Sequence, residues 1–243
     1  MYVPCVDCRL RHRPCFRPFS DEELKSISTL KTNHLAIPAK TDIVSEGEVG
    51  GALYTLYEGW AFRYQTLAGG SRQILDLLLP GEIIGLSSAL LGANRHSVQT
   101  LTPVSLCVLD GFPLSKLLRR HIDLTLDLLR WRVEEEHRAD TRIALLGRQK
   151  PLQRVGHLML ETFDRLRRLE LANGTICPFP LQRQHVADAV GLSMIHLNRT
   201  LTQLRDERLA AIEDKTLIIY DRRRLAELSG YTSLQLIPQR VLL

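Results

Sequence analysis

The sequence predicts an α+β protein, in which a β-sheet domain near the N-terminus is followed by a helix-rich C-terminal part. Two patterns support this prediction. Between residues 36 and 110, short apolar and β-branched runs alternate with glycine-bearing turns, which is typical of a β-barrel or sandwich. From residue 113 onward, apolar residues instead recur every three or four positions, which is the spacing of an amphipathic helix.

The composition is that of a globular protein. The chain has 243 residues, of which 44% are hydrophobic and 24% charged, so we expect one large domain or two modest ones and exclude wholesale disorder. It contains no run of 18 apolar residues that could cross a membrane, and its N-terminus lacks the pattern of a signal peptide. We therefore expect a cytoplasmic protein without a membrane partner.

The β-domain is predicted from six strand-like runs separated by turns. A short helix precedes them, because Ser20 can cap its first turn and Glu23 stands at the capping-box position. The runs cover residues 42–44, 52–57, 60–64, 73–77, 98–101 and 105–109.

A single long helix is predicted for residues 113–147. Its apolar residues form one stripe between charged residues, so we expect the helix to pack against its own copy in a homodimer. The alternative is that it packs along its own β-domain. Because Glu136 and Asp140 would face their own copies, like charges would leave dimerisation only marginally favourable. The expected interface residues are Ile122, Leu126, Leu129, Val133, Glu136 and Ile143.

Three of the five cysteines fall close together near the N-terminus. A cytoplasmic chain does not use cysteines for structural disulfides. The Cys-x2-Cys step and the third cysteine let thiolates converge on a metal, which is either zinc or iron–sulfur. A fourth ligand must come from elsewhere: His12 could serve zinc, and Cys107 either metal. The alternative is a group of incidental thiols. The cysteines are Cys5, Cys8, Cys15, Cys107 and Cys177.

The region after residue 181 predicts a helix-turn-helix. A short helix over 182–190 ends at Gly191, where a left-handed residue costs nothing. Ser193 then caps a second helix over 194–208. Two short helices around such a tight turn can place the second helix in a major groove of DNA.

A β-hairpin is predicted directly after these helices. The runs 209–212 and 217–220 flank a polar turn, as in the wing of a winged helix. Residues 150–243 also hold 14 Lys/Arg against 10 Asp/Glu. Together these features predict binding to double-stranded DNA. The alternative is a helical hairpin that touches no nucleic acid.

The order of these parts and three motifs resemble the Crp/Fnr family of bacterial transcription regulators. The resemblance implies a cyclic-nucleotide-binding-type β-barrel (jelly roll), a dimerisation helix and a C-terminal winged helix-turn-helix. It implies a homodimer on a palindromic operator, with RNA polymerase as a further partner. An enzyme is not expected, because no nucleophile stands in a motif with a paired His and Asp. The motifs are LYTLYEG at 53–59, LPGEIIG at 79–85, and VGLS at 190–193 with NRTL at 198–201.

The resemblance also implies the division of the chain. The predicted parts are a cysteine-bearing segment (1–20), a sensory β-barrel domain (21–112), a dimerisation helix (113–147) and a winged helix-turn-helix domain (148–243).

Two branches of this family differ in what they sense. The cyclic-AMP branch holds its nucleotide with a Gly-Glu-Leu turn and an Arg-Ser pair. This chain has IIG at 83–85 and RHS at 95–97, so the paired phosphate donors and the ribose acceptor are lost. Cyclic-nucleotide binding is therefore not expected, and Arg95 is interpreted as a solvated loop residue.

The Fnr branch combines an N-terminal cysteine cluster with one cysteine on a late barrel strand. Cys107 matches that place, so the resemblance implies a [4Fe–4S] cluster on Cys5, Cys8, Cys15 and Cys107 that makes dimerisation and DNA affinity sensitive to oxygen or redox state. The second gap here is x6, whereas the best-known members have x5. Cys177 is left as a structural thiol. The alternative is a family regulator with a small-molecule effector, or with zinc or thiol redox sensing, and no iron–sulfur cluster.

In the family, a Glu and an Arg on the second helix read base edges. Arg199 keeps the arginine, which can grip guanine O6 and N7. Ile195 stands at the glutamate position and can touch a thymine methyl instead, and Asn198 could read adenine. Ser193 begins this helix at the DNA interface, and His196 contacts phosphate or nothing. The operator half-site should therefore differ from those of both branches.

Overall fold

The computed structural model describes residues 3–109 and 114–233. The chain divides into two compact units, and the division falls between Glu135 and Glu136, inside one helix. The predicted domain boundary at residues 112 and 113 lies outside the described residues. Within the described ranges, no helix combines the length and the apolar character that crossing a membrane requires.

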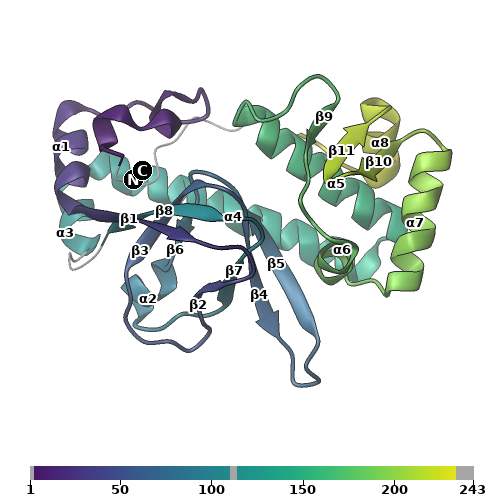
Figure 1. The fold of residues 1–243 in the computed structure, drawn as a ribbon, viewed down its shortest axis with the longest axis horizontal. Helices are drawn as coiled ribbons and strands as arrows, with labels where there is room; N and C mark the ends of the chain where they lie inside the picture. The colour runs from purple at the N-terminus through teal and green to yellow at the C-terminus, as the bar shows by residue number, and fades with distance from the viewer. Residues whose placement is uncertain (1–2, 110–113, 234–243) are drawn as a thin grey trace. The chain divides into compact units, whose positions relative to one another are not determined.

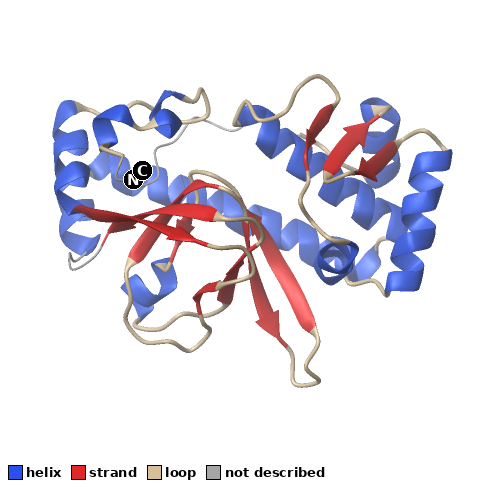
Figure 2. Cartoon of the chain, viewed as in Figure 1, coloured by secondary structure: helices blue, strands red, loops and turns tan. Residues whose placement is uncertain are grey.

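The N-terminal unit contains two four-stranded antiparallel sheets (Figures 1 and 2). Their strand orders are β1-β8-β3-β6 and β2-β7-β4-β5, so the predicted barrel is a jelly-roll-like sandwich rather than a closed barrel. Leu56 and Leu106 from the first sheet pack with Val98 from the second in one apolar core. The strands are β1 (Lys31–Ile37), β2 (Asp42–Val44), β3 (Leu53–Glu58), β4 (Ala61–Thr66), β5 (Arg72–Leu78), β6 (Ile83–Ile84), β7 (Ser97–Thr100) and β8 (Val104–Leu109).

All six predicted strands are present, but β1 and β6 were not predicted. Most residues of β1 are exposed or half-buried, so its sequence lacks the alternation that marks a half-buried strand. It forms because β8 supplies a partner, with His34 opposite Cys107. β6 is two residues long and pairs with β3. Both depend on long-range pairing, which a local sequence window does not contain.

The predicted single helix over 113–147 is wrong in one respect. The structure has two helices, α3 (Leu114–Arg120) and α4 (Ile122–Arg148), which are separated at His121. The hydroxyl of Thr125 donates to the carbonyl of Leu118 at 2.7 Å and to that of His121 at 3.2 Å. Such side-chain bonds compete with the helical hydrogen bonds of the backbone, which explains the break.

The described part of this unit contains four further helical segments. The capping box of α1 (Asp21–Leu30) forms as predicted, because Ser20 and Glu23 exchange hydrogen bonds. α2 (Leu86–Leu91) is a short helix between two left-handed glycines. Of two 3-10 turns, Cys5–Asp7 and Arg9–His12, the first begins at Cys5, and Cys8 lies between them.

The C-terminal unit is a winged helix-turn-helix. A three-stranded sheet in the order β10-β11-β9 extends the predicted hairpin by one strand. Cys177 lies on that additional strand opposite Leu217 and is 2% exposed, so its thiol belongs to the core. The elements are α5 (Pro151–Arg168), β9 (Ile176–Pro178), α6 (Arg183–Val190), α7 (Met194–Asp206), β10 (Ala210–Glu213), β11 (Thr216–Ile219) and α8 (Arg222–Ser229).

Candidate functional site

The turn of the helix-turn-helix is built from two local signals. α6 ends at Gly191, which lies in the left-handed region at φ 62°. A Cβ at this position would come within 3.0 Å of the Leu146 side chain, so both conformation and space favour glycine. Ser193 caps α7, because its hydroxyl accepts a hydrogen bond from the backbone N–H of His196. Ser193 therefore orients α7.

The outer face of α7 carries the residues predicted to read DNA. Ile195 is 67% exposed, and His196 and Arg199 are also exposed. Asn198 is half-buried, and its Oδ1 accepts a hydrogen bond from Nη1 of Arg183 at 2.8 Å. Arg183 was not predicted, because it lies on α6 and nothing in the sequence of α7 points to it. The opposite face is buried through Leu197, Thr200 and Leu204.

The wing is a tight hairpin. Asp214 and Lys215 both have positive φ values, 44° and 61°, between paired residues Glu213 and Thr216. Positive φ at both central positions is the pattern of a type I′ turn, whose twist matches that of the flanking strands. The carbonyl of Lys215 accepts a hydrogen bond from Phe179 N–H at 2.6 Å, which ties the wing to the segment that follows β9.

One stripe of α4 is apolar and exposed. Ile122, Leu126, Leu129 and Val133 are 67%, 41%, 56% and 63% exposed, and Ile143 is 69% exposed. With Glu136 and Asp140 these residues follow one another in steps of four and three, which is the heptad spacing of a helix-helix seam. We call these seven residues the α4 seam.

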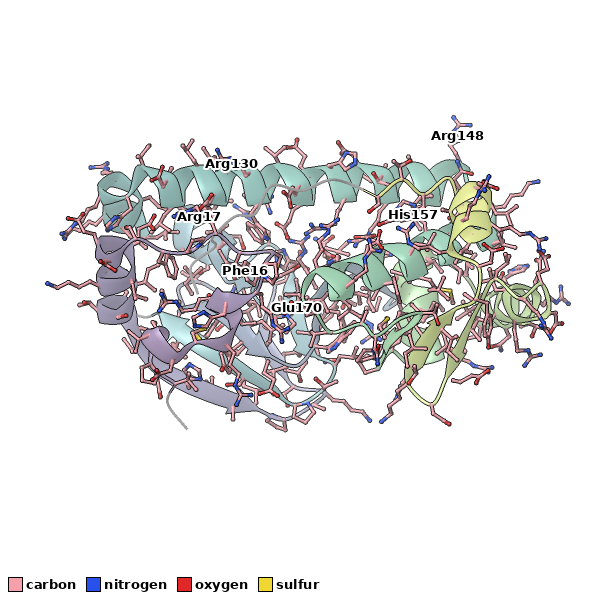
Figure 3. All side chains as sticks on the ribbon, turned by 90° about the horizontal axis from the view of Figure 1, so that it is seen from above. Phe16, Arg17, Arg130, Arg148, His157 and Glu170 are labelled. Atoms are coloured by element: carbon pink, nitrogen blue, oxygen red, sulfur yellow. The ribbon has the colours of Figure 1, made fainter. Side chains whose placement is uncertain are left out.

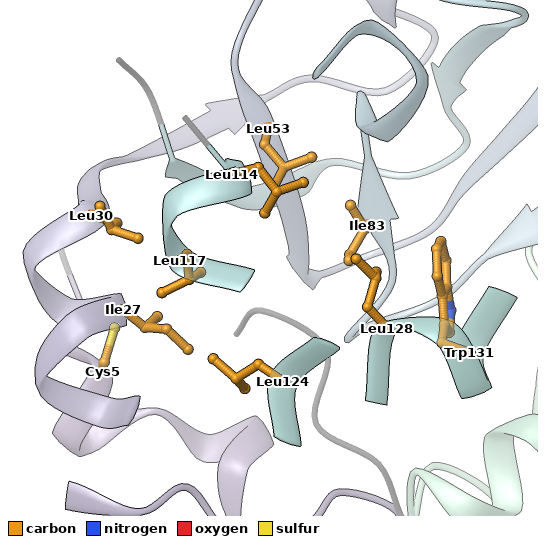
Figure 4. Packing of buried hydrophobic residues seen from close by; sticks show 10 residues of the cluster. All are labelled: Cys5, Ile27, Leu30, Leu53, Ile83, Leu114, Leu117, Leu124, Leu128 and Trp131. Atoms are coloured by element: carbon orange, nitrogen blue, oxygen red, sulfur yellow. The ribbon is translucent and has the colours of Figure 1, made fainter. Parts of the chain in front are cut away.

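A different face of α4 packs in the N-terminal unit. Leu124, Leu128 and Trp131 are buried in an apolar cluster with α1 and α3 (Figure 4). This face agrees with the alternative in which the helix packs along its own β-domain, because the same cluster holds Leu53 and Ile83 of that domain. Ile122, Leu129 and Val133 of the seam stay exposed.

The cysteines come from both ends of the N-terminal unit. Cys5 and Cys8 are each 4% exposed and Cys107 is 2% exposed, whereas Cys15 is half-buried. Cys5 packs in the same apolar cluster as Ile27 of α1 (Figure 4). Burial raises the pKa of the Cys107 thiol to about 11; among neighbouring charges, Lys31 lowers this pKa and Cys8 and Cys5 raise it. Cys107 therefore lies within electrostatic range of two cysteines that precede it by about a hundred residues.

Among the described residues, one group of three potential ligands gathers within 4.8 Å, and it consists of Asp76, Glu82 and Glu135 rather than cysteines. Arg63 lies 3.3 Å from a Glu135 oxygen and 3.9 Å from an Asp76 oxygen. Asp76 and Glu135 are therefore partners of Arg63 in an ion-pair network. Within the part of the chain that the structure describes, no three of the four candidate cysteines gather as closely as these carboxylates do.

His34 is a neighbour of Cys107 that the sequence did not reveal. Its Nε2 lies 3.3 Å from the Cys107 Sγ, and its ring stands edge-on to Tyr57. Burial, together with the charge of Lys31, lowers the pKa of His34 to about 4, so the ring is neutral at neutral pH. His34 was missed because it lies on β1, the strand without a local signal.

The two units match known domains in the order in which they occur. A cyclic nucleotide-binding domain matches residues 35–121, and a Crp-like helix-turn-helix domain matches residues 153–228. The chain is 29% identical to the transcriptional activatory protein AadR of Rhodopseudomonas palustris, over 88% of this chain and 86% of that protein. It is 26% identical to the transcriptional activator protein FnrL of Cereibacter sphaeroides, over 93% and 92%.

The fold is also that of a solved regulator. The structure of FixK2 from Bradyrhizobium japonicum superposes with a TM-score of 0.73 and 24% identity, covering 83% of this chain and 98% of that one. The chain belongs to the Crp/Fnr family. It is accordingly a DNA-binding transcription regulator, as the helix-turn-helix predicted.

In this Crp/Fnr protein, the segments compared with the nucleotide site of the cyclic-AMP branch lie in the N-terminal unit. Ile83 and Ile84 are both buried on β6, and Arg95 is exposed. The exposure of Arg95 agrees with its interpretation as a solvated loop residue, and the absence of cyclic-nucleotide binding stays a prediction.

Two contacts hold the described part of the cysteine segment against the rest of this Crp/Fnr protein. The ring of Phe16 lies over Gly81, where an added Cβ would come within 2.2 Å of the ring, so a glycine is needed there. Arg17 bridges two buried carboxylates: its Nη2 is 2.8 Å from a Glu23 oxygen, and its Nε is 2.7 Å from an Asp127 oxygen. Figure 3 shows Phe16, Arg17 and Arg130; Arg130 also contacts Asp127, at 3.2 Å. Arg17 thus connects the cysteine segment to α1 and to α4.

Proposed function

We propose that this regulator couples DNA binding to the redox state of a [4Fe–4S] cluster held by Cys5, Cys8, Cys15 and Cys107. The observation that carries the proposal is that Cys5 and Cys8 lie close enough to Cys107 on β8 to raise the pKa of its thiol, although they belong to the other end of this unit. Four thiolates are the ligand set of such clusters, and each of them binds a different iron atom.

The surroundings of the cysteines suit a negatively charged centre. Cys5, Cys8 and Cys107 are buried, and Lys31 is the cation that lowers the pKa of Cys107. Ligation requires thiolates, so binding the cluster releases protons from these buried thiols. When bound, the cluster would supply a group that oxygen or a related oxidant can destroy.

The route from the cysteines to DNA passes through α4. Arg17 follows Cys15 by two residues and binds Asp127, which lies between seam residues Leu126 and Leu129. A movement of the cysteine segment would therefore act on α4 next to the seam. A homodimer formed through the seam would present two copies of α7 to two half-sites of a palindromic operator. The same bound dimer would offer its surface to RNA polymerase.

The acidic residues of the α4 seam would make dimerisation sensitive to the bound cluster. Glu136 is exposed and Asp140 lies one turn further along α4. In a symmetric pair of helices, each faces or adjoins its own copy, which disfavours the dimer. A few kcal/mol from a bound cluster could then shift the balance between monomer and dimer.

The test is anaerobic purification followed by iron and sulfide analysis and an absorption spectrum. We expect about four irons and four sulfides per chain for a [4Fe–4S] cluster, their loss in Cys107→Ala, and their retention in Cys177→Ala. Exposure to air should then lower iron content, particle mass and DNA affinity together. Zinc in place of iron, or iron loss that leaves both dimer and DNA affinity unchanged, would contradict the proposal.

A further inference from the structure

Asn198 lies on a flank of α7 rather than on its outermost line. Successive residues of a helix turn by about 100°, so Thr202 and Arg205 follow Asn198 on the same side, while Ile195 and Arg199 point farther outward. This flank borders a hollow of about 150 Å³ between α7, the start of α6 and β10. Arg183, Asn198, Thr202, Arg205 and Glu213 are among the residues that line it.

The contact between Arg183 and Asn198 sets the orientation of the amide. Arg183 is the first residue of α6, and its Nη1 donates to Oδ1 of Asn198 at 2.8 Å. A guanidinium has donors and no acceptor, so the amide atom that faces it has to be the carbonyl oxygen. The NH₂ group of Asn198 is consequently the end of the amide that points away from Arg183.

We propose that Arg183 is a positioning residue for base readout, which makes Asn198 a donor-only reader. This inference rests on the DNA-binding function of α7. An asparagine that reads adenine uses both ends of its amide, because Nδ2 donates to N7 while Oδ1 accepts from N6. Arg183 takes one of the two lone pairs of the oxygen and holds the oxygen toward the hollow, away from the outermost line of α7, so the adenine pair is disfavoured in this geometry.

The bases favoured by such an amide carry acceptors in the major groove. Guanine offers O6 and N7, and thymine offers O4, whereas cytosine presents a donor. At the base pair under Asn198, the preference is therefore for guanine, which offers two acceptors, over adenine and thymine, which offer one each, and over cytosine. This differs from the adenine contact that the type of residue 198 alone suggests.

The experiment is selection of duplexes from a randomised library by the full-length chain, purified anaerobically, at one fixed salt concentration. The variants are Arg183→Met, Asn198→Ala and their combination, with Arg205→Met as the matched control. Arg205 lines the same hollow, but its guanidinium contacts the neighbouring Asp206 and not Asn198. The base pair under Asn198 is identified as the one whose preference changes in Asn198→Ala.

We expect Arg183→Met to shift relative affinity at that base pair toward adenine by about tenfold, which lies within the discrimination of one good amide–base pair. The shift should vanish when residue 198 is alanine. Arg205→Met should weaken all sequences alike, as loss of a phosphate contact does.

Three outcomes would overturn the role of Arg183. In the first, Arg183→Met weakens binding to every sequence and leaves the base preference unchanged. In the second, Arg183→Met still shifts the base preference when it is combined with Asn198→Ala. In the third, Asn198→Ala alone leaves the base preference unchanged. A wild-type chain that selects no sequence would overturn both this role and the DNA-binding function.

Discussion

The cysteine-bearing unit and the helix-turn-helix differ in how far their charged and polar side chains are exposed. In the N-terminal unit, Asp127 is fully buried and Glu23 is 3% exposed, and both pair with Arg17, which lies 110 residues before Asp127. In the helix-turn-helix, Arg199 and His196 are exposed on a helix that is capped locally. A buried charge that loses its partner destabilises the fold, whereas an exposed one can change without that cost. The buried charges beside the cysteine segment are thus linked to stability in this protein, whereas the exposed residues of α7 are separated from it.

Arg17→Ala should have the largest effect, because it leaves two buried carboxylates without their shared cation. Removing one partner of a buried ion pair typically costs about 3–5 kcal/mol of unfolding free energy. Denaturant unfolding of the purified chain measures this loss. Arg130→Ala is the control, since the Arg130 side chain is 50% exposed and exposed pairs contribute about 1 kcal/mol or less. Equal losses in the two variants would contradict the comparison.

Charges on the α4 seam should abolish dimerisation with little effect on the folded chain. Leu129→Asp combined with Ile143→Asp places carboxylates where apolar side chains would meet, which costs at least about 2 kcal/mol per central interface residue. Light scattering should show monomers with weak DNA binding. Leu90→Asp is the matched control, because Leu90 is exposed on α2 outside the seam. If the seam variant stays dimeric, the interface lies elsewhere.

Arg199→Ala should change specificity and leave stability unaltered. A bidentate contact with guanine discriminates against the wrong base by about 1–3 kcal/mol. Binding to a set of half-site variants at one salt concentration should therefore show flattened preference, with the unfolding free energy unchanged. Arg223→Ala removes an equal charge from a side chain that is 91% exposed on α8, and it should leave base preference intact. Equal weakening on every sequence would assign Arg199 to phosphate.

His96→Gln should have the smallest effect on the free energy of unfolding at neutral pH, and this effect should grow as the pH falls. Burial, with Arg63 and Arg132 nearby, lowers the pKa of His96 to about 4, whereas an unfolded histidine titrates near about 6.5. The neutral ring stabilises the fold fully above the unfolded pKa, and this contribution is lost as pH falls from about 6.5 toward about 4. His96→Gln should reduce the loss of unfolding free energy between these pH values. The prediction is wrong if His96→Gln leaves the slope of stability against pH unchanged.

The candidate sites contain residues that the sequence predicted and residues that it missed. The outer face of α7 and the α4 seam were predicted residue by residue, because helical spacing alone decides which side chains share a face. Arg183 and His34 were missed, since each acts on a residue of another element, and only packing brings them to Asn198 and Cys107.

Two elements show where the spacing of apolar residues does not predict the backbone. The periodicity of 113–147 continues through His121, but the hydroxyl of Thr125 competes for the carbonyl of Leu118 and interrupts the helix. The strand β1 has no alternating pattern, yet it pairs with β8 along its length. In both cases a hydrogen bond that the pattern does not register decides the backbone.

The sequence by itself determined the family, the capped helices, the turn at Gly191, the heptad seam and the four candidate cysteines. Each of these depends on residues that stand close together in the chain or on a motif that is read as a unit. Only the tertiary structure decided that Cys107 lies within electrostatic range of Cys8 and Cys5, and that Arg17 binds Asp127 across 110 residues of sequence. The physical reason is that packing pairs buried charges and thiols over separations that periodicity cannot span.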